Sequence, residues 1–211
     1  SQFLAMSSPD TVFMADEFVE RIAQDQGVYR VFNLANFSPV YLNTALRKGV
    51  NVAYYDSQNL NSAVRYMAIA FNVEQKSYSV ETLLDPKSIT NPSLINILNV
   101  KYIISNEPIP RLNTELLLES NGVGLYRNVD FKQKAFVAYE VVPLPSAAAV
   151  FQQLSENNTD YSSTVLVEAN HDVPELEAGN YSVAVTKYSP NEIAIKAETT
   201  SNGFLFLSES Y

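Results

Sequence analysis

One segment of this 211-residue chain has the side chains that carbohydrate recognition requires. Tyr54, Tyr55 and Asp56 stand together, and Asn59 and Arg65 follow shortly after. Proteins bind sugars in an open groove, through aromatic faces and hydrogen bonds from Asn and Asp side chains. Arg65 could pair with Asp56 or hold an anionic group. In the structural alternative, the tyrosines belong to the core, Asp56 caps the next helix, and Arg65 is exposed on that helix.

Two other groups have the residue types of acid–base or metal chemistry. Asp16, Glu17 and Glu20 fall on one expected helical turn, and a glycosidase needs two facing carboxylates about 5 to 10 Å apart. Acidic residues also stabilise the positive end of a helix dipole, so we interpret these three as structural. His171 and Asp172, near Glu168, could hold a metal or act as a base and its orienting partner. They lie in a loop that contains Pro174, which favours an inert surface histidine.

No sequence motif for catalysis or cofactor binding stands out. The serines lack an elbow motif, and six glycines do not form a phosphate-binding loop. The absence of cysteine excludes disulfides and thiolate ligands, and a single histidine excludes a His-rich metal site. We therefore expect no catalytic residue, metal or cofactor in this chain.

Composition limits the fold and the partners. An apolar fraction of 46% is ample for the core of one large domain or two small ones. Fourteen Lys and Arg against 23 Asp and Glu give a net charge of −9, which works against nucleic acid as a partner. The longest nearly apolar stretches are far shorter than the roughly 18 to 20 residues that span a bilayer.

The first part, residues 1–143, alternates helix and strand signals. Apolar residues at steps of three and four predict a helix from Met14 to Gln26, and Asn91-Pro92 predicts a helix start. A further apolar stripe predicts a helix at 60–71. Strands are expected at 29–34, 100–105, 124–129 and 135–142. The aromatic, polar segment 36–59 is expected to be irregular, and loops of that length are often functional. The elements predict a mixed sheet covered by helices.

The second part, residues 144–211, begins where Pro143 and Pro145 break the chain. Ser146 is expected to cap a short helix. Four strands without helical periodicity follow at 164–169, 181–188, 192–199 and 203–209, with turn signals before the last two. These strands predict an antiparallel β-meander, half of a β-sandwich. The whole chain is therefore predicted to be α+β.

Both chain ends have the character of a piece of a larger polypeptide. The chain begins with Ser1, and the apolar strand that starts at Phe204 has no turn, cap or polar tail before Tyr211. We expect the function to belong to the parent chain.

Short pieces of this sequence resemble, in the same order, segments of the extracytoplasmic C-terminal part of bacterial YfhO-type proteins. These are polytopic membrane proteins related to the GT-C glycosyltransferases. The pieces are Tyr29-Arg-Val-Phe-Asn-Leu34, Tyr54-Tyr55-Asp56 with Arg65-Tyr66, Leu98-Asn-Val-Lys-Tyr-Ile-Ile104, Leu125-Tyr-Arg-Asn128 with Lys134-Ala-Phe-Val137, Tyr188-Ser-Pro-Asn-Glu-Ile193 and Leu207-Ser-Glu-Ser-Tyr211. The chain departs from the family pattern at Ala53, where no glycine precedes the tyrosines, and at Val64, where an arginine is expected.

The resemblance implies a parent with many transmembrane helices that transfers sugar from a polyprenyl-phosphate donor. This domain would lie on the periplasmic or extracellular side of the bacterial membrane. Its partners would be the transmembrane portion of its own chain and glycan or lipid-linked sugar. The catalytic acid of such relatives lies in an early loop, so this domain would be non-catalytic. Two alternatives stay open: a purely structural or protein-interaction module, and a soluble glycoside hydrolase with two acids facing one cleft.

Overall fold

The centre of the molecule is a mixed sheet with the strand order β2-β1-β3-β5-β4. The computed structural model describes residues 17–35, 52–53, 61–72, 85–156, 159–171, 173–189 and 191–209. The sheet strands are β1 (Arg30–Asn33), β2 (Val52–Ala53), β3 (Val100–Ser105), β4 (Thr114–Ser120) and β5 (Val123–Asn128). β1 runs parallel to β2 and β3, and β5 runs antiparallel to β3 and β4.

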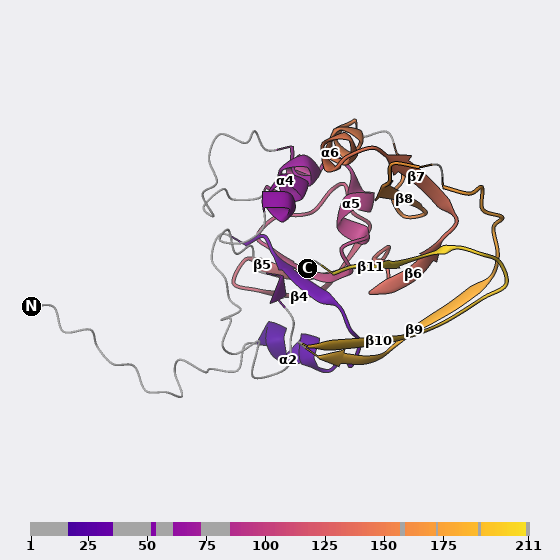
Figure 1. Cartoon of the computed structure of the whole chain (residues 1–211). Helices are drawn as coiled ribbons and strands as arrows, with labels where there is room; N and C mark the ends of the chain where they lie inside the picture. Colours follow the sequence, from indigo (N-terminus) through magenta and orange to yellow (C-terminus); the bar gives the residue numbers. More distant parts are fainter. Residues whose placement is uncertain are drawn as a thin grey trace, which may run out of the picture.

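Helices cover both faces of this sheet (Figure 1). α2 (Glu17–Ala23) buries Phe18, Val19 and Ile22 on one face. α4 (Asn61–Ala70), α5 (Pro92–Asn96) and α6 (Ala147–Ser155) lie on the other, with the short 3-10 helix η1 (Pro86–Ser88) before α5. Neighbouring residues of β1 point to opposite faces of the sheet: Val31 packs with the apolar residues of α2, and Phe32 packs with those of α4, α5 and α6. This alternation is the period of two that a central strand requires.

The helix starts at α5 and α6 agree with the sequence. The side chain of Asn91 accepts a hydrogen bond from the Ser93 amide, and Pro92 occupies the first helical position, where its missing N–H costs nothing. Ser146 caps α6 in the same way, through the Ala149 amide. The predicted strand at 100–105 is β3, with the same bounds.

The predicted four-stranded meander is wrong in its topology. Only β9 (Tyr181–Ser189) and β10 (Glu192–Thr199) form the expected hairpin. β8 (Thr164–Glu168) instead pairs in parallel with β7 (Glu140–Leu144), and α6 supplies the crossover that a parallel pair needs. β11 (Phe204–Leu207) pairs with β6 (Ala135–Ala138).

An apolar match explains the pairing of β11. All four residues of β6 are buried, and Phe206 of β11 lies against Phe136 with ring centroids 4.9 Å apart. β10, by contrast, has no fully buried residue. The predicted single strand at 135–142 is therefore two strands with different partners, β6 and β7.

The coarse fold class is confirmed: the described residues form a mixed sheet, further strand pairs and few helices, compatible with α+β. The division at residue 143 stays a prediction, and β11 crosses it to reach β6. Among the described helices, none combines the length and the apolar character needed to cross a bilayer.

Candidate functional site

Buried polar side chains gather around α5 and the turn that follows β5. In the described part of the chain, the buried polar or charged residues apart from Ser105 are Asn91, Ser93, Asn96, Asn99, Asn128, Lys134 and Ser208. Buried polar groups cost free energy unless they form hydrogen bonds. A concentration of them at one end of the sheet therefore marks an organised polar site.

Three asparagines tie the turn at 130–134 to the end of α5. The side-chain amide of Asn128 donates to Asn96 Oδ1 at 2.8 Å and to the Val100 carbonyl at 3.0 Å. Asn99 Nδ2 donates to the Lys132 carbonyl at 2.9 Å, and the Lys132 amide donates to the Asn96 carbonyl at 2.9 Å. Asn99 has φ 60, a left-handed conformation that asparagine tolerates well. These hydrogen bonds fix the turn at 130–134 and the end of α5 relative to β3.

An open pocket of about 780 Å³ lies over this network. The lining comes from three segments: residues 90–93 and 96 around α5, residues 130–132 in the turn, and residues 159, 160 and 162 after α6. We call this the polar pocket. Its only aromatic lining residue in the described part of the chain is Phe131.

The wall formed by the segment after α6 is held by its own hydrogen bonds. Asn91 Nδ2 donates to the Thr159 carbonyl at 2.9 Å, and the Tyr161 amide donates to Ser93 Oγ at 3.0 Å. Asp160 accepts from the amide and hydroxyl of Ser162, each at 2.9 Å. The wall is therefore formed before any ligand arrives.

Several groups at the pocket remain available to a ligand. Asn96 Nδ2 donates to no acceptor, and Lys132 forms no ion pair, within the described residues. Asp130 is exposed and accepts from Asn113 Nδ2 at 3.2 Å. Phe131 is half-buried, and the Lys101 ammonium lies 5.3 Å from its ring centroid. The pocket combines donors, acceptors and an apolar ring.

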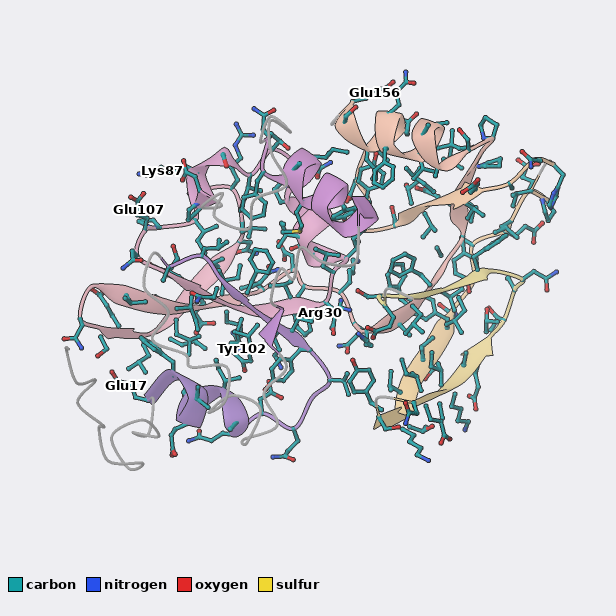
Figure 2. All side chains as sticks on the ribbon, turned by 60° about the vertical axis from the view of Figure 1, so that its left-hand side comes forward. Glu17, Arg30, Lys87, Tyr102, Glu107 and Glu156 are labelled. Carbon is teal, nitrogen blue, oxygen red and sulfur yellow. The ribbon has the colours of Figure 1, made fainter. Side chains whose placement is uncertain are left out.

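A second polar cluster lies where β11 ends. Arg30 Nη1 donates to Ser208 Oγ and to the Leu98 carbonyl, at 2.9 and 2.7 Å, and Arg30 Nη2 forms an ion pair with Glu209 at 3.3 Å. Lys134, only 2% exposed, forms an ion pair with the same carboxylate, and the Tyr188 hydroxyl donates to it at 3.3 Å. In Figure 2, Arg30 lies between the main sheet and the C-terminal strand. We call this the Glu209 cluster.

Burial and ion pairing oppose each other in the Glu209 cluster. Burial alone would raise the pKa of Glu209, but the contact with Lys134 and the charge of Arg30 outweigh it and lower this pKa below its ordinary value. Burial lowers the pKa of Lys134, and the pairing with Glu209 only partly offsets that effect. Ionisation of the Glu209 carboxylate therefore stabilises the folded chain.

A third cluster joins α2 to β3. Asp25 accepts from Lys101, from the Tyr102 hydroxyl at 2.8 Å and from the Gly27 amide at 3.0 Å. Tyr102 lies between the sheet and α2 (Figure 2), and burial together with its bond to Asp25 raises its pKa to about 12. These hydrogen bonds hold α2 on the sheet, and we assign the cluster a structural role.

The residues predicted to contact ligand are not tested by this structure. Tyr54, Tyr55, Asp56 and Asn59 lie outside the described residues, and so does the side chain of Arg65, whose backbone belongs to α4. Their binding role stays a prediction.

The other predicted groups are only partly described. Glu17, Glu20, Glu168 and His171 are exposed, whereas Asp16 and Asp172 lie outside the described set. No three His, Cys, Asp or Glu side chains of the described residues are grouped so that they could hold a metal ion.

The polar pocket could not be predicted from the sequence, because each of its three segments has a local explanation. Asn91 reads as a helix cap, Asp130 and Lys132 as a charged turn, and Asp160 as part of a short loop. The frequency of Asn in the chain does not identify a site.

No family model, no curated protein and no solved structure matches this chain.

Proposed function

We propose that this chain is a non-catalytic, extracytoplasmic domain that binds carbohydrate in the polar pocket. The observation that carries the proposal is the pocket itself: an open, polar hollow with one aromatic ring and a buried scaffold of hydrogen-bonded amides. Asn91, Ser93 and Asn96 line it and are each more than nine-tenths buried.

The chemistry of the lining suits sugar hydroxyl groups, which both donate and accept hydrogen bonds. Asp130 and Asp160 supply acceptors, and Asn96 and Lys132 supply donors. The ring of Phe131 offers an apolar surface to the C–H face of a sugar. Hydrogen bonds to neighbours already hold Asn91, Ser93 and Asp160 in place, so binding costs little ordering of these residues.

The YfhO-like sequence pieces support a membrane-protein parent. Five of these pieces contribute Arg30, Asn99, Asn128 with Lys134, Tyr188 and Glu209, all of which belong to the asparagine network or the Glu209 cluster. We propose that the parent is a sugar transferase that uses polyprenyl-phosphate donors, with its catalytic residues elsewhere. This domain then lies on the periplasmic or extracellular side of a bacterial cell membrane and contacts the transmembrane portion of its own chain.

One observation favours a glycoside hydrolase as a second candidate: Asp130 and Asp160 line the same pocket. A general acid of this class is typically held in an apolar setting. Both aspartates are exposed and accept hydrogen bonds from polar neighbours. This arrangement suits binding of hydroxyl groups better than proton donation. A purely structural or interaction module is the remaining alternative, and it predicts no saccharide binding.

We expect the chain to bind a subset of oligosaccharides on a glycan array and Phe131→Ala to weaken that binding about tenfold. The loss corresponds to roughly 1.5 kcal/mol for removing a half-buried aromatic contact. Isothermal titration of the array hits measures the change, and Asp130→Asn serves as a second pocket variant. The matched control is Tyr181→Ala, which removes an exposed aromatic side chain from β9.

The outcomes separate the three functions. Thermal melts first confirm that Phe131→Ala and wild type are both folded. If the two then bind saccharide with equal affinity, the sugar binds outside the polar pocket. Absence of any array hit would favour the structural or interaction module. Release of reducing sugar ends from bound oligosaccharides would favour the hydrolase.

A further inference from the structure

The orientation of the Asn96 side chain is fixed by its neighbours. Asn128 Nδ2 donates to both Asn96 Oδ1 and the Val100 carbonyl, and Asn128 Oδ1 accepts from the Asp130 amide at 3.3 Å. Reversing the Asn96 amide would set two N–H groups against each other, so its oxygen must face Asn128. Asn96 is 7% exposed and lines the polar pocket, and its Nδ2 finds no acceptor among the described residues.

Lys132 supplies a second available donor next to Asn96. Its backbone amide is bonded to the Asn96 carbonyl at 2.9 Å, which holds the two residues together at the pocket. Among the lysines that the structure describes, Lys132 alone has no carboxylate within ion-pair distance. The others form the ion pairs Lys87–Glu107, Lys101–Asp25, Lys134–Glu209, Lys187–Glu192 and Lys196–Glu198.

We infer that the polar pocket selects sugars that carry a carboxylate, which Asn96 Nδ2 and the Lys132 ammonium hold together. The inference rests on the proposed function and names its ligand class. A neutral amide donor and a cation match the two oxygens of a carboxylate, and hydrogen bonds that involve charged groups are the stronger ones. With a net charge of −9, the chain disfavours anions in general, so this preference must come from local groups.

The two aspartates of the pocket limit the charge of the ligand. Asp130 and Asp160 accept from hydroxyl groups but repel anionic groups. A monoanionic carboxylate beside Lys132 is tolerated better than a phosphate, which carries −1.5 to −2 charges at about neutral pH. The class that fits is a uronic acid or a similar carboxylated sugar, with neutral hydroxyls directed at the aspartates.

The test is titration of the whole chain with uronic-acid oligosaccharides, each paired with its methyl ester, at low salt. We expect wild type to bind the free acids about tenfold more tightly than the esters. Lys132→Gln should lose this preference and keep its affinity for the esters, whereas Lys132→Arg should retain it. Lys87→Gln, an exposed lysine on η1, is the matched control and should behave as wild type.

Four results would overturn the inference. Equal affinity of wild type for acids and esters would leave carbohydrate binding intact and reject the carboxylate preference. Persistence of the preference in Lys132→Gln would assign it to other residues. Tighter binding of glucose 1-phosphate than of any uronate would replace carboxylate by phosphate. Failure of wild type to bind acids, esters and the other glycans of the array would reject the proposed function as well.

Discussion

Glu209→Gln is expected to lower the free energy of unfolding by about 3 kcal/mol, because it removes the counter-ion of two cations at once. Lys134 is 2% exposed, and the Glu209 carboxylate is the only anionic group that pairs with it in the described chain. Arg30 loses its ion pair with the same carboxylate. The measurement is urea denaturation of wild type and variant near neutral pH, with equal m-values as the check that the transition is comparable.

Two further variants distinguish a lost ion pair from general damage at the end of β11. The double variant Lys134→Met with Glu209→Gln should regain a large part of the loss, because it removes the buried charge that the single change leaves behind. Glu198→Gln, which disrupts the exposed pair with Lys196, should cost less than about 1 kcal/mol. A Glu209→Gln cost as small as this control would contradict the assigned role of the Glu209 cluster.

The Glu209 cluster also predicts how the free energy of unfolding falls at acid pH. The folded-state pKa of Glu209 lies below the ordinary value of 4.5, so the unfolded chain binds its proton more tightly than the folded chain. The stabilisation is therefore complete above pH 4.5 and is lost as the pH falls through the lower folded-state value. Wild type should lose stability more steeply than Glu209→Gln in this range.

Asn128→Ala is expected to cost about 2 to 3 kcal/mol and to weaken saccharide binding as well. Asn128 is fully buried, and its removal leaves Asn96 Oδ1 and the Val100 carbonyl without their donor. Asn96 then loses the contact that directs its Nδ2 toward the pocket. Thermal or urea unfolding measures the first effect, and titration of an array ligand under folding conditions measures the second.

The matched control for Asn128→Ala is Asn170→Ala, an exposed asparagine outside the network, which should change stability by less than about 0.5 kcal/mol. Asn128→Asp should be at least as harmful as Asn128→Ala, because a carboxylate would face the Asn96 oxygen. If Asn128→Ala is as stable as the wild type, the asparagine network is not a scaffold for the pocket.

Elements with strong local signals could be predicted from the sequence. The Asn91 cap followed by Pro92, the β-rich run from Val100 to Ser105 and the hairpin of β9 and β10 depend on neighbouring residues alone. β4 could not be predicted, because its three consecutive leucines do not alternate. The pairing of β4 with β5 changes register between Leu116 and Leu118, which breaks the alternation at Leu117.

Strand partners could not be predicted, because pairing depends on surfaces that are distant in the sequence. β11 pairs with β6 rather than with its sequence neighbour β10, and β8 pairs with β7 across α6. The polar pocket has the same character, since its lining comes from three segments that only the fold brings together. The sequence does not indicate which asparagines meet in the fold.

Chemical-shift mapping of the isotope-labelled chain with a bound oligosaccharide shows whether sugar occupies the polar pocket. The polar pocket predicts that the largest amide and side-chain shifts fall on Asn96, Phe131, Lys132 and Asp160, with little change at the β9–β10 hairpin. Saturating shifts centred on a different surface, with these four residues unchanged, would rule out the polar pocket as the sugar-binding site.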